Sequence, residues 1–134
     1  MGDFRAGLYA SKSYIKKYGM PQTTLDLVDH KFIGTSNIDN LCFQFNERNI
    51  NLTPKNFVAS SNSGAVMWKL AKAGIGICVA PKMLGNSDLD IEEICSNLIN
   101  INNPTWLVTH QELKSNKRIR IVFDFIANKL KAGN

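Results

Sequence analysis

Short blocks of apolar and polar residues follow one another along the chain, and the spacing of the apolar positions changes from block to block. Apolar residues three or four apart indicate a helix, whereas alternating or uninterrupted short apolar runs indicate a strand. Strands and helices are therefore expected to alternate, as in a sheet with helices on its faces. In order, the pattern predicts a strand at 5–11, helices at 12–19 and 23–30, strands at 31–34, 41–49 and 56–61, a helix at 62–74, a strand at 75–81, the first turns of a helix at 87–95 and a helix at 117–130.

The stretch at 41–49 has two unlike faces. Its residues alternate between an apolar set and a second set, with Leu41, Phe43 and Phe45 on one side and Cys42, Gln44 and Asn46 on the other. A period of two is typical of a strand that is buried on one face. The sequence therefore predicts a strand here, and the strand at 56–61 is its expected neighbour.

A helix and a buried strand follow each other closely between residues 62 and 81. Asn62 or Ser63 is expected to cap the helix, and Gly74 is expected to end it in the left-handed conformation that glycine tolerates. The expected apolar face is Val66, Leu70 and Ala73, with Met67 and Ala71 on its flank. Residues 75–81 are almost wholly apolar and predict a central strand buried on both faces.

The composition is that of an ordinary globular domain. The chain has 134 residues, of which 44% are hydrophobic and 20% charged, enough for a core of its own without disulfides. The net charge is +5, and the densest basic patch lies at 114–120. No aromatic residues are interleaved with these charges and no helix–turn–helix pattern accompanies them, so a solvated face is favoured over a phosphate-binding one.

The three cysteines, Cys42, Cys78 and Cys95, are odd in number and widely spaced. They are best explained as free thiols in a reducing compartment. The start of the sequence has no apolar signal segment, and no apolar run approaches the roughly 20 residues of a membrane span. We therefore expect a cytoplasmic protein with no membrane partner.

Groups that would support catalysis are few. The two histidines, His30 and His110, belong to no triad or metal motif, and an active site needs several converging groups. The acidic run at 87–95 is interpreted as a solvated helix start. A thiol nucleophile, Cys42 or Cys78 with His110, is the enzymatic alternative, and it is disfavoured because Cys78 lies in the buried strand. The sequence predicts no enzyme, no metal site and no cofactor.

Two polar clusters follow strands, at 34–37 (GTSN) and at 60–64 (SSNSG). Loops beyond the carboxyl ends of strands are where open α/β sheets bind ligands. The second cluster also begins a helix, where free N–H groups and the positive end of the dipole suit a carboxylate or another anion. On these observations alone, the simpler interpretation is favoured: Asn62 and Ser63 only cap the helix, and 34–37 only turns the chain.

Six segments, taken in order, carry a family resemblance. They are LYASKSYIKKYGMP at 8–21, DLVDHKFIG at 26–34, SSNSG at 60–64, AKAGIGICVAP at 71–81, TWLVTH at 105–110 and RIRIVFDFIANKL at 118–130. Together they resemble the effector-binding domain of LysR-type transcriptional regulators. The resemblance covers about residues 6–131, nearly the whole chain.

The resemblance implies an α/β fold of the type 2 periplasmic-binding-protein kind. Residues 5–108 would form the second lobe, a mixed sheet flanked by helices, and 109–134 the return segment and C-terminal helix of the other lobe. A small, anionic effector would bind in the cleft between lobes and modulate transcription without catalysis. The polar residues that match cleft loops then become expected effector contacts: Thr35, Ser36, Asn62 and Ser63.

The resemblance also sets expectations about partners. Regulators of this family begin with a winged-helix DNA-binding domain, and neither that domain nor the first part of the first lobe is recognisable in this sequence. DNA is thus expected as a partner only through such a domain. The terminal helix is apolar on more than one face, so we expect exposed apolar surface and a homo-oligomer. A solute-binding protein fragment for transport shares the fold and is the alternative.

Overall fold

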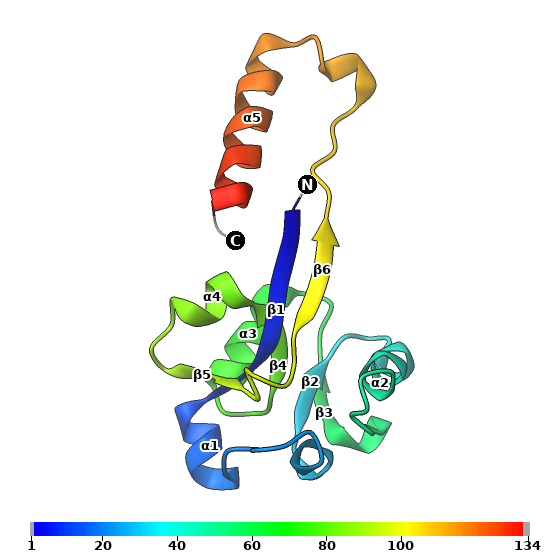
Figure 1. The fold of residues 1–134 in the computed structure, drawn as a ribbon, viewed down its shortest axis with the longest axis vertical. Coiled ribbons are helices and arrows are strands. Elements are labelled where there is room, and N and C mark those ends of the chain that lie inside the picture. Colours follow the sequence, from blue (N-terminus) through cyan, green and yellow to red (C-terminus); the bar gives the residue numbers. More distant parts are fainter. Residues whose placement is uncertain (1, 133–134) are drawn as a thin grey trace. The chain divides into compact units, whose positions relative to one another are not determined.

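A computed structural model describes residues 2–132, with the side chains of residues 5–102 and 106–132. It divides the chain into two compact units, one of Ala6–Asn100 and one of Met1–Arg5 with Ile101–Asn134. The elements are labelled in Figure 1. They are β1 (Gly2–Ser11), α1 (Lys12–Tyr18), η1 (Asp26–Asp29), β2 (Phe32–Gly34), α2 (Ile38–Asn46), η2 (Pro54–Asn56), β3 (Phe57–Ser60), α3 (Gly64–Lys72), β4 (Cys78–Pro81), α4 (Lys82–Asn86), β5 (Ile91–Ile94), β6 (Ile101–Thr105), η3 (Gln111–Leu113) and α5 (Lys117–Ala132).

The larger unit is built on a mixed sheet. Strand β1 pairs antiparallel with β4 and with β5, and β2 pairs parallel with β3. A parallel bridge between Phe32 and Ile77 joins these two groups of strands. The bridge rests on two backbone hydrogen bonds, from Ile33 N to Ile77 O at 2.8 Å and from Ile77 N to Lys31 O at 2.9 Å. The strands therefore lie in the order β3-β2-β4-β1-β5, and the predicted strand at 75–81 is confirmed as a central one.

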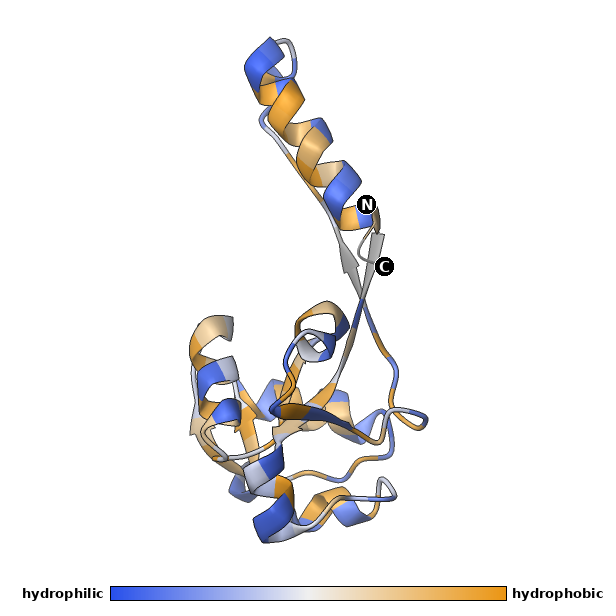
Figure 2. Ribbon diagram, turned by 90° about the vertical axis from the view of Figure 1, so that its left-hand side faces the viewer, coloured by the Kyte–Doolittle hydropathy of each residue, from blue (hydrophilic) through white to orange (hydrophobic). Residues whose placement is uncertain are grey.

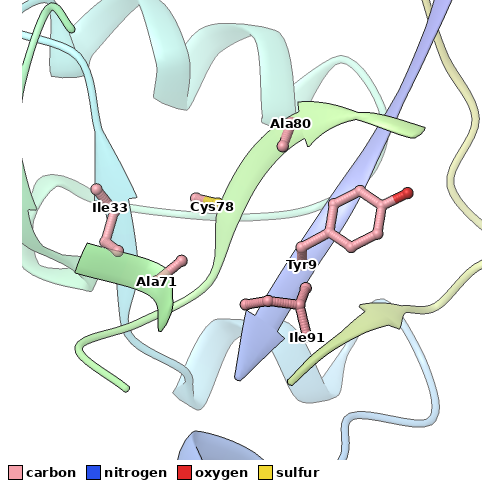
Figure 3. Packing of buried hydrophobic residues seen from close by; sticks show 6 residues of the cluster. All are labelled: Tyr9, Ile33, Ala71, Cys78, Ala80 and Ile91. Atoms are coloured by element: carbon pink, nitrogen blue, oxygen red, sulfur yellow. The ribbon is translucent and has the colours of Figure 1, made fainter. Parts of the chain in front are cut away.

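The core of this unit lies on both faces of the sheet. Figure 3 shows one face, where Tyr9, Ile33, Cys78 and Ile91 of four different strands form a buried cluster with Ala71 of α3. Phe32, next to Ile33 in β2, points to the opposite face because side chains alternate along a strand. There it meets Phe45 of α2 with ring centroids 5.7 Å apart. Helices thus cover the sheet on both sides, as predicted.

The predicted strand at 41–49 is wrong, because these residues belong to helix α2. The side chain of Asn37 caps the helix by accepting a hydrogen bond from Asn40 N at 3.2 Å. Cys42 and Phe45 are buried three positions apart, whereas Phe43 is 61% exposed. The alternation of apolar residues was misleading, because the residues that are actually buried are spaced as in a helix. The cap that starts this helix, Asn37, lies outside the segment predicted as a strand.

Helix α3 and strand β4 follow each other as predicted. Ser63 caps α3, and Gly74 has a φ of 79°, in the left-handed region. The expected apolar face is partly wrong: Ala71 is buried and Met67, Trp68 and Leu70 pack on the core, whereas Val66 and Ala73 are exposed. The helix is rotated toward the Trp68 side, where that ring meets Tyr9 edge-on at 5.9 Å.

The predicted helix start at 87–95 is also wrong. Residues 91–94 form strand β5, with Ile91 and Ile94 buried against β1. The acidic residues before it are held in a turn, where the Asp88 carboxylate pairs with Lys72 at 2.8 Å and accepts a hydrogen bond from Asp90 N. A strand is favoured here because it buries both isoleucines in the core, whereas a solvated helix would leave them exposed.

The smaller unit contains α5, which confirms the helix predicted at 117–130. None of its residues is buried, and Figure 2 shows apolar residues along it. Two cavities of about 370 and 330 Å³ lie between residues 107–114 and the α5 side chains of Ile119 and Phe123. Within residues 2–132, no helix is both long and apolar enough to cross a membrane.

Candidate effector site at one edge of the sheet

Four strands of the larger unit end at the same edge of the sheet. Strands β2 and β3 are parallel, and the Phe32–Ile77 bridge makes β4 parallel to both. Strand β5 runs the same way, because β4 and β5 both pair antiparallel with β1. The loops that follow these strands therefore gather at one edge. Two of them are the polar clusters at 34–37 and 60–64.

The side chain of Asn62 joins the two clusters. Its Oδ1 accepts hydrogen bonds from Ser36 N at 3.1 Å and from Ser36 Oγ at 2.9 Å. Backbone pairing supports the contact, since Ser61 N donates to Gly34 O at 2.9 Å. Ser36 and Asn62 are exposed, and Thr35, the residue directly after β2, is half-buried. Residues 26 positions apart are thus brought into one polar surface.

Ser63 stands beside this contact at the start of α3. Its Oγ accepts a hydrogen bond from Val66 N at 3.4 Å, and its own N donates to Ser61 Oγ at 3.1 Å. The next N–H groups of the helix, those of Gly64 and Ala65, have no acceptor within the helix. The first turn of α3 carries no acidic residue. The positive end of the helix dipole is therefore not offset by a carboxylate of the helix itself.

The structure places all four expected contact residues at this edge, and it also makes two of them structural. Ser63 caps α3, and Asn62 holds the 34–37 loop. The capping interpretation and the site interpretation thus describe the same side chains. Asn62 keeps its amide NH₂ outside the two bonds to Ser36, and this group can donate to a ligand.

The sequence did not point to Lys82, which lies at the same edge directly after β4. Its ammonium pairs with Glu93 Oε1 at 2.9 Å, so its charge is largely matched by that carboxylate. The sequence did contain a signal for this position. Pro81 ends β4, so the next residue, Lys82, lies at the end of the strand. Glu93 lies opposite Tyr9 in the sheet. Burial, with the Glu93 charge second, raises the pKa of Tyr9 to about 12.

Two thiols of this unit, Cys42 and Cys78, are poor nucleophiles. Cys78 is buried in β4, and burial raises its pKa to about 12. Burial also raises the pKa of Cys42, and Asp39 adds to the effect. Neither thiol is thus readily converted to the thiolate that nucleophilic catalysis requires. Among the side chains that the structure describes, no three His, Cys, Asp or Glu residues are grouped as a metal site would need.

A cavity of about 410 Å³ lies beside the end of β5 in the same unit. Its lining comes from residues 20–22 and 95–98 together with Glu93, and includes none of the four expected contact residues. Cys95 there has a φ of 52°, and its Sγ lies 3.6 Å from Pro21 O. The cavity therefore adjoins the end of β5 and is not lined by the polar clusters at 34–37 and 60–64.

Comparison with solved structures identifies the architecture. The regulatory domain of CrgA, a LysR-type transcriptional regulator from Neisseria meningitidis, matches 96% of this chain with a TM-score of 0.78 at 22% sequence identity. The chain has the fold of a LysR-type regulatory domain. Full-length CrgA matches equally well, and full-length AphB, the Vibrio cholerae virulence activator, matches 96% of the chain with a TM-score of 0.67 at 14% identity. The predicted periplasmic-binding-protein-like fold class is confirmed.

The match is one of fold and covers part of each regulator. The chain spans 66% of the CrgA regulatory domain and 46% of full-length CrgA and of full-length AphB. No protein-family model matches the sequence, and no curated protein matches it significantly. What these regulators bind and control therefore enters the account of this chain as a proposal.

Proposed function

We propose that the chain is an effector-sensing segment of a LysR-type transcriptional regulator. It would bind a small anionic molecule at the edge formed by residues 34–37 and 60–64, and the bound state would change how the whole protein acts on transcription. The observation that carries the proposal is the double hydrogen bond from Ser36 to Asn62 Oδ1 beside the start of α3. The shared fold with CrgA and AphB supports it.

The anionic character of the effector is inferred from the start of α3. An anion gains from the free N–H groups and the dipole at a helix N-terminus, by roughly 0.3–1 kcal/mol at an exposed site. Ser36 Oγ, Asn62 Nδ2 and the free amides of α3 are all hydrogen-bond donors, and no carboxylate of the first turn of α3 competes with a ligand. A carboxylate, with two acceptor oxygens, suits such a set of donors.

The mechanism proposed is a population shift between conformations. A ligand can move such an equilibrium only as far as its affinities for the two states differ. The Ser36–Asn62 contact gives one route, because a ligand that takes the Ser36 hydroxyl must compete with the Asn62 acceptor. Ligand binding would then reset the geometry of the 34–37 loop relative to α3.

Domain assignment and DNA contact belong to the proposal as well. Residues 5–108 would be the second lobe and 109–134 the return segment and C-terminal helix of the other, and the compact unit Ala6–Asn100 falls within the first span. DNA would be bound by a winged-helix domain of the same regulator. CbnR, which shares the fold over 76% of this chain with a TM-score of 0.54, has been solved with its target DNA.

Amide NMR of the ¹⁵N-labelled chain tests the site. Acetate, benzoate and succinate are titrated as probes, with chloride at equal ionic strength as the reference. We expect saturable shifts of the Ser36, Asn62 and Gly64 amides, because these donors would face the carboxylate. Asn62→Ala is expected to weaken probe binding at least fivefold, since it removes one donor and frees the 34–37 loop.

Asn128→Ala is the matched control, an exposed asparagine on α5, and binding by this variant should equal that of the unchanged chain. Shifts that are centred on other residues would place the carboxylate site elsewhere. Shifts that grow linearly without saturation for every probe would reject an anion site at this edge.

A further inference from the structure

Tyr9 carries a buried hydroxyl that the described residues leave unpaired. The residue is 1% exposed, and neither its hydroxyl nor Glu93 Oε1 has a hydrogen-bond partner among the side chains and backbone that the structure describes. Figure 3 shows the hydroxyl pointing away from the other labelled side chains. Burial raises the pKa of Tyr9 to about 12, so the group stays protonated and can donate at neutral pH. Because buried polar groups are nearly always paired, an arrangement that gives this hydroxyl an acceptor is favoured by that bond.

The Glu93 carboxylate faces the Tyr9 ring across Gly7. A Cβ on Gly7 would lie 2.7 Å from Glu93 Oε1 and 3.4 Å from Tyr9 Cε2, so both atoms border the space above this glycine. Glu93 Oε1 is paired with Lys82 instead, whose Nζ lies 2.9 Å away. These two atoms form an ion pair without the alignment of a hydrogen bond. The carboxylate thus has two candidate donors, the ammonium and the phenol, and only the ammonium is engaged.

Lys82 also lies beside the proposed anion site. It follows Ile77 by five positions and Ser36 follows Phe32 by four, and the parallel bridge between Phe32 and Ile77 joins their two strands. Neighbouring strands are about 4.8 Å apart, so Lys82 and Ser36 leave the same edge of the sheet at similar heights. The lysine side chain is long and flexible, and 27% of it is exposed. Its ammonium therefore has a carboxylate held at Ser36 within reach, as an alternative to Glu93.

We infer that Lys82 is a contact of the anion site and that it exchanges partners when an anion binds, an inference that rests on the proposed function. In the arrangement described above Lys82 pairs with Glu93. With an anion bound, Lys82 pairs with the carboxylate of the effector, and Glu93 accepts a hydrogen bond from the Tyr9 hydroxyl. The phenol is essential to the exchange, because a half-buried carboxylate that loses its cation is costly unless another donor replaces it. The exchange couples the anion site to β1 and β5, which carry Tyr9 and Glu93.

Acetate titration of single and double variants, followed by amide NMR, tests the exchange. Lys82→Met removes the cation and should weaken acetate binding about fivefold, whereas Glu93→Gln releases Lys82 from its competing partner and should tighten binding about threefold. The tightening should be absent in the Lys82→Met background, because it acts through the lysine and not through the change in net charge. Lys55→Met and Glu47→Gln are the matched controls, since they make the same changes in charge at exposed positions outside the loops of the site.

Tyr9→Phe distinguishes the exchange from a purely structural role. It removes a buried hydroxyl that no described residue pairs with, so the free energy of unfolding without acetate should not fall. Acetate binding should nevertheless weaken about threefold, because Glu93 loses the donor that replaces Lys82. In the unchanged chain with ¹³C-labelled tyrosine, the Cζ resonance of Tyr9 should shift as acetate saturates the site, and it should stay in place in the Lys82→Met variant.

Two results would overturn the inference while the anion site itself stands. The first is tightening by Glu93→Gln that persists in the Lys82→Met background, which would be a general effect of charge. The second is a Tyr9→Phe chain that binds acetate as tightly as the unchanged chain. Both tests hold even if Lys82→Met alone lowers stability, because neither variant leaves Glu93 charged without Lys82. Failure of the proposed function looks different: the unchanged chain then shows no saturable shifts, and the Lys82 contact is rejected with the site.

Discussion

Replacing Gly76 with alanine is expected to destabilise the larger unit by about 1–3 kcal/mol, the usual effect of overpacking a close contact. A Cβ at this position would lie 2.9 Å from Lys31 O and 3.2 Å from Lys31 C. That carbonyl accepts the hydrogen bond from Ile77 N at 2.9 Å, in the bridge that joins β2 to β4. It can retreat only by weakening a bond worth roughly 0.5–1.5 kcal/mol.

The matched control is Gly64→Ala at the start of α3. A Cβ there meets nothing within 4 Å, and alanine in a helix is favoured over glycine by up to about 1 kcal/mol. Urea unfolding, followed by the fluorescence of Trp68 in a Trp106→Phe background, measures both changes in the larger unit. The reasoning is refuted if the Gly76→Ala chain unfolds at the same urea concentration as the unchanged chain or at a higher one.

Two further predictions concern α2 and the histidine of the larger unit. Phe45→Ala should lower the free energy of unfolding by about 3–5 kcal/mol and Phe43→Ala by no more than about 0.5 kcal/mol. The reason is that Phe45 is 4% exposed and Phe43 61% exposed. Similar losses for the two variants in urea unfolding would instead support the strand interpretation. Burial lowers the pKa of His30 from 6.5, against the opposing charges of Asp26 and Asp29, so the folded state binds fewer protons than the unfolded chain. The free energy of unfolding should therefore fall as the pH drops below about 6.5, until the folded-state pKa is passed. His30→Gln should remove this part of the pH dependence, and a variant with the same profile as the unchanged chain would contradict the assignment.

Most of the larger unit could be predicted from local signals. Ser63 caps α3 and Gly74 takes the left-handed conformation, both as expected. These features need only a few neighbouring residues, because a cap or a positive φ is set by local hydrogen bonds and sterics. The apolar run at 75–81 was equally direct, since a strand buried on both faces has no polar positions to confuse its period.

The errors came from segments whose burial is decided by distant residues. Phe43 and Phe45 look alike in the sequence, but only the structure shows that Phe45 is the one that packs against Phe32 of β2. Ile91 and Ile94 lie among acidic residues, and their pairing with β1, about 80 positions away along the chain, makes them a strand. Tertiary contacts of this kind produce no recognisable pattern in the neighbouring sequence.

The candidate site was predictable to the level of its loops. The polar clusters at 34–37 and 60–64 follow strands, and parallel strands deliver such loops to one edge. The bond between Ser36 and Asn62 was beyond the sequence, because it depends on the register of β2 against β3. The structural roles of Asn62 and Ser63 likewise depend on contacts that only the folded chain makes.

The Ser36–Asn62 contact has an evolutionary consequence. A side-chain oxygen at position 62 that takes both donors of position 36 ties the identities of two residues 26 positions apart. Related sequences that lose the hydroxyl at 36 would no longer need an amide or carboxylate at 62, and the two positions should then vary together. In related sequences where the two positions vary independently, a different contact would have to hold the 34–37 loop against the start of α3.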